Sequence, residues 1–501
     1  MKKISITAHE KNIYIYFISI LAILIFSILS ISSIWGNYGF FMDTLEHIHA
    51  SWLVSEGKVP YRDFFEHHNP LLWYLFAPFT KLFYRDVNII YMARLIAILG
   101  YFYTLIVLFS ISKNYSKSNI GAYLSVIFMF CIPSLFNDIQ NFRPDIFMYI
   151  SVLLAIKNFF KYLDTYKLKY LCISYFLWFI AFLFLQKALF PILGFGLANL
   201  WLVYKNKLPK KDIFKASLLP LICFLILLFI LYKYDLIYDY FNCNYIFNMI
   251  LKDEYGVYKT GYNSIFKYFV IFTSLLVLTT YKQSTKGNLL LIIWIILSLA
   301  SFEFAPHPQY FFLNFIFSSI LISPILSHYK KICILAFLPC ILYNFTCIHF
   351  NNYKRMEQNI NLINYVMKNT NVEDKLLNGI LSVNLFNHDT DYYWFGFHNI
   401  VILADLYTER HFDYNEQIKK HNPKFLFLSD ISDKLCFNNT KWLMRRNGAL
   451  IKKASKGYKN ALNKLVLPKL DYWEIDNDYI KKHYKFINKY DKIELWQRID
   501  N

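Results

Sequence analysis

The chain has 501 residues, of which 56% are hydrophobic and only 17% are charged, and its mean hydropathy is +0.31. This composition is too apolar for one soluble domain of this length and predicts a multi-spanning α-helical membrane protein. The formal net charge is +19. No basic and aromatic pattern specific to nucleic acid accompanies it, so we expect membrane lipids and no nucleic acid as partners.

The first apolar run carries no charge between Lys11 and Asp43. It is long enough to cross about 30 Å of hydrocarbon, and no small-residue cleavage site follows, so it predicts a transmembrane helix rather than a signal peptide. The stretch 71–83 is short and contains Pro78, which favours a position at the membrane interface. With the first run, the predicted spans total about eleven. The others are 90–112, 118–136, 145–163, 170–186, 188–204, 215–233, 265–281, 287–302, 310–327 and 332–350.

Lysines mark alternate connections between these spans. They are Lys2, Lys3 and Lys11; Lys113 and Lys117; Lys157, Lys161, Lys167 and Lys169; Lys205, Lys207, Lys210, Lys211 and Lys215; Lys282 and Lys286; and Lys330 and Lys331. Positive residues favour the cytoplasmic side, so the N-terminus is predicted to be cytoplasmic. The outer side then receives residues 36–88, 138–145, 233–262 and everything after about 351.

The composition of the sequence changes near residue 351, where the long apolar runs stop. We therefore divide the chain into a transmembrane domain at 1–350, with an outer loop at 36–88, and a soluble domain at 351–501. The second domain is predicted to be α/β and extracytoplasmic. Its expected elements are a helix at 359–368, strands at 376–383 and 425–428, and a hairpin of 484–488 with 493–496.

The outer loop concentrates titratable groups just after the first span: Asp43, Glu46, His47, His49, Asp63, Glu66, His67 and His68. At about 100° per residue, Asp43, Glu46 and His47 share one helical face. The opposite face is apolar and contains Leu45, Ile48 and Trp52. We expect a helix that lies on the membrane with its carboxylates in a watery cleft, although a solvated polar loop is the simpler alternative.

Three other places put polar groups near the membrane edge, where a partner or a function is expected. In NFRPD, Arg143 and Asp145 flank a proline, and the segment is either a binding site or an ordinary helix start. Lys187 either reaches the outer surface or meets a phosphate. His307 and Tyr310 in PHPQY belong either to a rigid turn or to the lip of the same cleft.

Metal binding is a minor possibility. The pair Asp389 and Asp391 forms a DxD, a pattern so common that we interpret it as a loop. The histidines of the outer loop match neither HExxH nor a structural zinc spacing. We predict that no cofactor is required, while a divalent metal remains possible.

Four segments, in this order, carry a resemblance to lipid-dependent integral-membrane glycosyltransferases of the GT-C type. They are MDTLEHIHASWLVSEGKVPYRDFFEHHNPLLWYLFAPF, NFRPD, LQKALF and PHPQY. The chain is most similar to the bacterial branch related to protein O-mannosyltransferases and to the aminoarabinose transferase of lipid A. The likeness covers residues 10–350, and DYYWFGF and NPKFLFL extend it less distinctly into the tail.

The resemblance implies an inverting transfer of a sugar from a polyprenyl phosphate to a lipid, glycan or protein acceptor at the outer face of the bacterial inner membrane. Asp43 matches the carboxylate that acts as general base. Relatives often place a second carboxylate directly beside it, whereas here Glu46 follows three residues later, so either of the two is a candidate base. Relatives also have a lysine in FEKP at the lipid phosphate.

This chain reads FEHHNP at that place. His67 and His68, or Arg143 with Lys187, would therefore meet the phosphate, with Asp145, His307 and Tyr310 as further substrate-binding candidates. Two other functions remain open: a transporter or flippase of a lipid-linked sugar, and an envelope glycan polymerase or ligase. A transporter should place its ionisable residues near the middle of broken helices.

Overall fold

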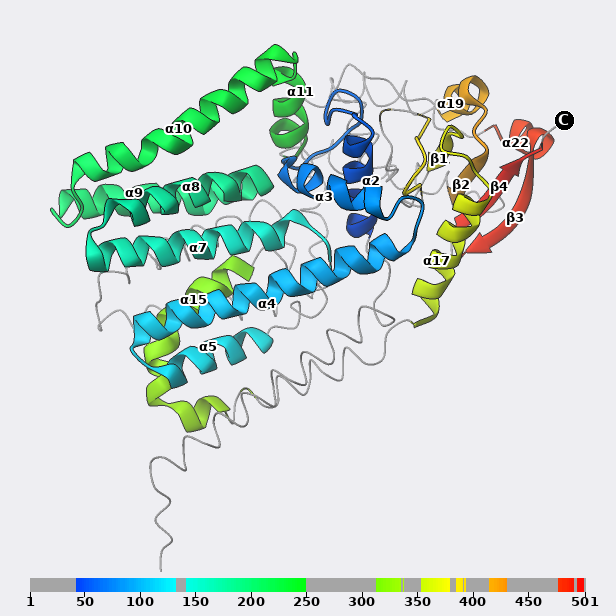
Figure 1. The fold of residues 1–501 in the computed structure, drawn as a ribbon. Helices are drawn as coiled ribbons and strands as arrows, with labels where there is room; N and C mark the ends of the chain where they lie inside the picture. Colours follow the sequence, from blue (N-terminus) through cyan, green and yellow to red (C-terminus); the bar gives the residue numbers. More distant parts are fainter. Residues whose placement is uncertain are drawn as a thin grey trace, which may run out of the picture.

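The computed structural model describes residues 42–131, 141–248, 312–334, 337, 353–378, 384–390, 392, 414–429, 476–490 and 493–499. In these residues a set of long helices runs side by side, shorter helices lie at one end of this set, and a small sheet lies next to the same end (Figure 1). The candidate site lies where these three parts meet.

The long helices follow the predicted spans closely. Their bounds are α4 Asn88–Ser116, α5 Asn119–Phe130, α7 Pro144–Thr165, α8 Leu168–Phe184, α9 Leu189–Tyr204, α10 Lys210–Lys233 and α15 Phe312–His328. Four helical stretches in the described residues are long and apolar enough to cross a membrane: α4, α7, α10, and α9 with the preceding turn η1 Gln186–Ala188. The predicted first span, those at 265–281 and 287–302, and most of 332–350 lie outside the described residues.

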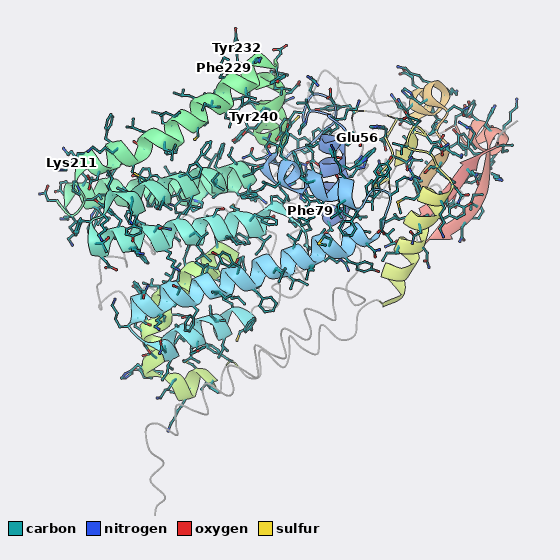
Figure 2. The ribbon with its side chains drawn as sticks, viewed as in Figure 1. Glu56, Phe79, Lys211, Phe229, Tyr232 and Tyr240 are labelled. Atoms are coloured by element: carbon teal, nitrogen blue, oxygen red, sulfur yellow. The ribbon has the colours of Figure 1, made fainter. Side chains whose placement is uncertain are left out.

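Helix α10 shows why this bundle belongs in lipid. Its middle is almost entirely apolar, yet only Ala216 and Leu231 of the helix are buried. Figure 2 shows Phe229 and Tyr232 pointing away from the protein, and Phe229 is 63% exposed. Such a surface is stable against hydrocarbon and unfavourable in water.

The two ends of the bundle differ in charge. Lys211 lies at the end of α10 opposite to Tyr232 (Figure 2). The connections from α4 to α5, from α7 to α8 and from α9 to α10 carry lysines and lie at the Lys211 end (Figure 1). Helices α2 Met42–Ser55, α3 Leu71–Leu82 and α11 Ile237–Phe241 gather at the other end.

Small residues allow close helix packing inside the bundle. An ideal Cβ added to Gly121 of α5 would lie 2.4 Å from the carbonyl oxygen of Ser323 in α15. Next to this contact, Ser125 Oγ donates to the Ser319 carbonyl oxygen at 2.9 Å. Close backbone approach and hydroxyl-to-carbonyl bonds of this kind stabilise helix pairs in membranes.

Helix α2 corrects one expectation. The predicted watery face is mostly covered, because His47 is fully buried and Glu46 is only 7% exposed, while the side chain of Asp43 is still 40% exposed. The predicted membrane face is also covered by protein: Trp52 packs on Phe386 and His388 of the C-terminal part, with ring centroids 6.2 and 4.9 Å apart. An amphipathic pattern identifies the apolar stripe of a helix but not the partner that covers it.

The C-terminal residues form a unit of strands and helices. Its sheet has the order β1-β2-β4-β3, with β1 Leu376–Asn378 parallel to β2 Phe425–Ser429 and the other pairs antiparallel. The hairpin of β3 Tyr484–Tyr490 and β4 Ile493–Arg498 is confirmed. Helix α17 Tyr353–Lys368 begins earlier than predicted, and α19 Tyr414–His421 and α22 Asn477–His483 were not predicted.

Candidate active site

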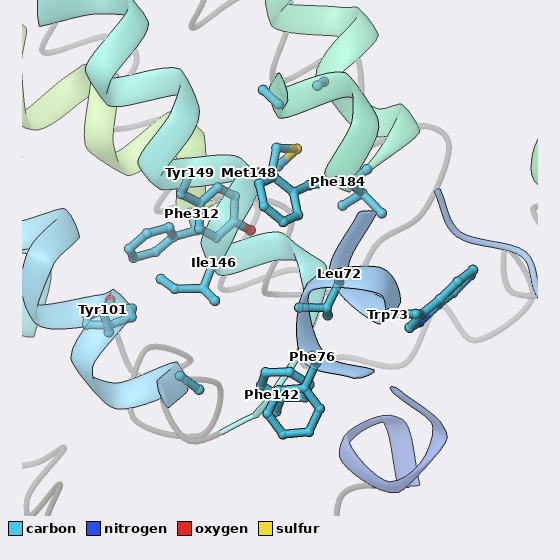
Figure 3. Packing of buried hydrophobic residues seen from close by; sticks show 14 of the residues in the cluster. Leu72, Trp73, Phe76, Tyr101, Phe142, Ile146, Met148, Tyr149, Phe184 and Phe312 are labelled. Atoms are coloured by element: carbon cyan, nitrogen blue, oxygen red, sulfur yellow. The ribbon is translucent and has the colours of Figure 1, made fainter. Parts of the chain in front are cut away.

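The mouth of the site is built on the segment that starts α7. Phe142 packs against Phe76 of α3, with ring centroids 4.3 Å apart (Figure 3). The backbone N–H of Phe142 donates to Thr44 Oγ1 in α2 at 3.1 Å. Pro144 then occupies the first turn of α7, where its missing N–H has no helical partner to lose. These contacts hold the next side chain, Arg143, against α2.

Arg143 joins two carboxylates. One Nη atom contacts the carboxylate of Asp43, and Nε lies 3.1 Å from Oδ2 of Asp145. The side chain of Asp43 is 40% exposed, whereas those of Arg143 and Asp145 are 13% and 8% exposed. Asp145 thus lies in the first turn of α7 and also pairs with Arg143. Asp43 is the member of this group that a substrate can reach.

Lys187 lies in η1, between α8 and α9. Its neighbour Gln186 donates from Nε2 to the carbonyl oxygens of His67 and Asn244, at 2.9 and 3.3 Å. The positive charge of Lys187 acts on Asp145, His67 and His68. The structure therefore brings Lys187 to the same site as Arg143, although the two are far apart in the sequence.

Next to these residues lies a cluster of Glu46, Glu66, His67 and His68, which we call the inner cluster; His67 is half-buried and the other three are buried. One ligand-type atom from each residue can be chosen so that all four lie within 4.8 Å of one another. His68 Nδ1 is 3.6 Å from Glu46 Oε1 and 3.6 Å from Glu66 Oε2. This set can hold a divalent cation.

Burial dominates the electrostatics of the inner cluster. It raises the pKa of Glu46 and of Glu66 well above the usual value, and the charge of a neighbouring carboxylate adds to the effect for each. Burial also lowers the pKa of His67 to about 3 and that of His68 well below its usual value. Both imidazoles therefore favour the neutral form near pH 7.

His47 connects the inner cluster to α3. Trp73 Nε1 donates to His47 Nδ1 at 3.1 Å, and the His47 ring meets the His68 ring edge-on with centroids 5.1 Å apart. Burial and then the nearby Arg143 charge lower the pKa of His47 to about 3. A neutral ring that accepts at Nδ1 carries its proton at Nε2.

The C-terminal part covers the outer loop. Phe65 N donates to the Tyr392 carbonyl oxygen at 2.9 Å, and the Tyr392 hydroxyl donates to the Tyr61 carbonyl oxygen at 2.6 Å. His49 Nδ1 lies 3.3 Å from the Leu385 carbonyl oxygen. Residues of the C-terminal part thus contact the outer loop and α2 beside the site.

Several site residues escaped sequence reasoning, namely Thr44, Tyr61, Asn244, Asn248 and Tyr392. Asn244 and Asn248 are four residues apart beside an apolar run, which was the one available signal. His307, Tyr310 and Asp391 lie outside the described residues. Asp389 forms an isolated bridge with Leu376 in the tail.

Comparisons with known proteins support the resemblance. The family model for dolichyl-phosphate-mannose-protein mannosyltransferases matches residues 67–242, a segment that includes His67, Arg143 and Lys187. No curated protein matches the chain. Among solved structures, ArnT from Cupriavidus metallidurans bound to undecaprenyl phosphate is similar with a TM-score of 0.61 and 10% identity, over 99% of each chain.

The archaeal oligosaccharyltransferase AglB from Archaeoglobus fulgidus, in complex with an inhibitory peptide and a dolichol-phosphate, is similar with a TM-score of 0.49 and 10% identity. That match covers 84% of this chain and 70% of AglB. The family model and the ArnT likeness together confirm a membrane fold of the GT-C glycosyltransferase type.

Proposed function

We propose that this protein is an inverting glycosyltransferase that moves a sugar from a polyprenyl-phosphate donor to an acceptor of the cell envelope. The observation that carries the proposal is the pairing of exposed Asp43 with Arg143 at one end of the bundle. A carboxylate to activate the acceptor and a cation to hold a phosphate are the groups that this reaction needs. The family match at residues 67–242 and the ArnT-like fold support this class of donor.

In the proposed step, the acceptor hydroxyl or amine attacks the anomeric carbon of the sugar. The bond from this carbon to the phosphate oxygen breaks, and the polyprenyl phosphate leaves with the electron pair. Asp43 takes the proton of the acceptor and later releases it to water. Arg143 and Lys187 neutralise the charge of the leaving phosphate. When the donor is bound, Arg143 therefore contacts both Asp43 and the donor phosphate.

The base assignment follows from accessibility. Asp43 is 40% exposed in its side chain, whereas the side chain of Glu46 is 9% exposed and lies 3.6 Å from His68. A general base must come within hydrogen-bond distance of the proton that it removes. We therefore assign Asp43 as the base and give Glu46 no direct contact with the acceptor.

A transporter or flippase is the second candidate. The described acidic and basic groups of the site gather at one end of the bundle, beside α2 and η1, rather than near its middle. This position favours chemistry at a membrane surface over passage through the membrane. A polymerase or ligase would share the donor and transfer whole glycans, so only the product distinguishes it.

We place the site on the outer face of the bacterial inner membrane. The lysine-rich connections lie at the opposite end of the bundle, as the positive-inside rule requires of cytoplasmic loops. Reporters fused after Asn501 test this orientation. Alkaline phosphatase should be active there and green fluorescent protein dark; the reverse result would overturn the placement.

The proposed activity is tested with the purified full chain and a polyprenyl-phosphate sugar. To choose the sugar, lipid-linked and surface glycans of a deletion strain are compared with the parent by mass spectrometry. The expected result is an acceptor that loses one sugar while its lipid-linked donor accumulates. If the donor instead accumulates only on the inner leaflet and the purified chain transfers nothing, the flippase function is the correct one.

A further inference from the structure

The inner cluster has unusual electrostatics. Glu46 and Glu66 are buried side by side, and neither forms an ion pair with Arg or Lys in the described part of the chain; the ion-pair contact of each is His68. Their Oε1 atoms and His68 Nδ1 are buried without a hydrogen-bond partner among the described residues. Buried polar atoms are normally paired, so these three atoms indicate a missing partner.

From this geometry we infer that Glu46, Glu66, His67 and His68 form a zinc site. A tetrahedral zinc ion with bonds near 2.0–2.2 Å places its ligand atoms about 3.4 Å apart. The distances from His68 Nδ1 to Glu46 Oε1 and to Glu66 Oε2 are both 3.6 Å, already close to that spacing. The remaining pairs, all within 4.8 Å, need only side-chain adjustment.

The ligand types favour zinc over other common divalent cations. Two imidazoles with two carboxylates suit Zn²⁺, whereas Mg²⁺ and Ca²⁺ prefer oxygen ligands alone. Two carboxylates balance the charge of one Zn²⁺, so the buried site becomes neutral overall.

The backbone of the ligand pair is held in place from three sides. The His67 carbonyl oxygen accepts from Gln186 Nε2 at 2.9 Å and from Asn248 Nδ2 at 2.8 Å. The His68 carbonyl oxygen accepts from the Tyr61 hydroxyl at 2.6 Å. These hydrogen bonds hold the backbone of the two histidines in place before a metal binds.

A zinc ion with four protein ligands has no open position, which is typical of a structural site rather than a catalytic one. The ion would join Glu46 in α2 to residues 66–68 of the outer loop and so position Asp43, which lies one turn before Glu46. A neutral zinc centre adds no net charge for the donor phosphate, which leaves that role to Arg143 and Lys187. Glu46 is thus a metal ligand in the proposed enzyme. Only the effect of the zinc ion on the position of Asp43 rests on the proposed function.

The test measures metal in the full chain without any substrate. The protein is purified in detergent without chelators, and zinc is counted by inductively coupled plasma mass spectrometry. We expect one zinc per chain, and at least a tenfold weaker affinity in Glu66→Gln and in His68→Gln. His49→Gln is the matched control, because His49 is an equally buried histidine of α2 that contacts Leu385 instead.

A second measurement uses the wild-type chain and so does not depend on how well the ligand variants fold. The wild-type chain is stripped with a chelator and loaded with Co²⁺, which in a tetrahedral site gives strong visible absorption. That absorption should appear in the wild-type and His49→Gln chains, and Zn²⁺ should remove it. Wild-type protein that binds neither ion, or equal zinc in all variants, would overturn the site. Loss of transfer in Asp43→Asn would still support the proposed function, so the two failures are distinguishable.

Discussion

Arg143 contacts Asp43 across 100 residues of sequence and, through its other edge, lies 3.1 Å from Asp145. A planar guanidinium can serve two carboxylates at once because its donors point along separate edges. The ion pair joins α2 to the start of α7 and puts a cation next to Asp43, whose side chain is 40% exposed. The first two predictions follow from this arrangement.

Asp43→Asn should reduce sugar transfer by about 10²- to 10⁴-fold, because it removes the base and keeps the shape of the side chain. The measurement is single-turnover transfer from a polyprenyl-phosphate sugar by the purified variant. Asp63→Asn is the control, since Asp63 pairs with Arg62 in the same loop but outside the site. Native transfer by Asp43→Asn would rule out its role as the base.

Arg143→Gln should impair both folding and donor use. It removes the arginine that pairs directly with buried Asp145, which we expect to lower stability by about 1.5–3 kcal/mol. The double variant Arg143→Gln with Asp145→Asn removes both charges and should recover thermal stability while donor use stays at least about tenfold weaker. Recovery of both properties in the double variant would show that Arg143 serves only folding.

Arg85 should hold the C-terminal domain against the outer loop. Its guanidinium donates to the carbonyl oxygens of Thr370, at 2.6 Å, and of Met367. Arg85→Gln should therefore lower stability by about 1.5–3 kcal/mol and speed proteolytic release of the tail. Arg62→Gln, which removes an arginine that is 45% exposed, should change neither quantity. Thermal unfolding and limited proteolysis of the full chain measure both.

Gly121→Ala should destabilise the contact between α5 and α15. The new Cβ would lie 2.4 Å from a backbone oxygen, so the helices must move apart, at a cost of about 1–3 kcal/mol. Gly196→Ala is the matched control in α9, where nothing lies within 4 Å of an added Cβ. The control should be neutral or slightly stabilising. Equal melting temperatures for the two variants would contradict the packing seen here.

Stability should fall as the pH drops below about 6.5, in part through His49. Burial lowers the pKa of His49 from 6.5 to about 3, so below pH 6.5 the unfolded chain binds a proton that folded His49 does not. This group contributes its full stability above pH 6.5, and the contribution declines by about 1.4 kcal/mol per pH unit on acidification. Unfolding of His49→Gln between pH 4.5 and 7.5 should show a correspondingly flatter dependence.

The sequence by itself determined the membrane class of the fold and most of its helices. Apolar runs such as 215–233 are long enough to cross a bilayer, and their lysine-rich flanks separate the two ends of the bundle. The hairpin of 484–488 and 493–496 was also predictable, because alternating apolar residues around a short turn are a local signal. Asp43, Arg143 and Lys187 stood out for the same kind of reason: charge at the end of an apolar run is conspicuous.

Only the tertiary structure decided which of these groups meet and which are buried. Helical periodicity predicted that one face of α2 contacts water. In the structure Tyr392 and Leu385, which are distant in the sequence, contact this region, and Trp73 of α3 covers His47. Asp43 and Glu46 look equivalent in the sequence, but they differ in burial: their side chains are 40% and 9% exposed. Desolvation depends on every segment that packs around a group, and residues more than 300 positions away supply part of that packing.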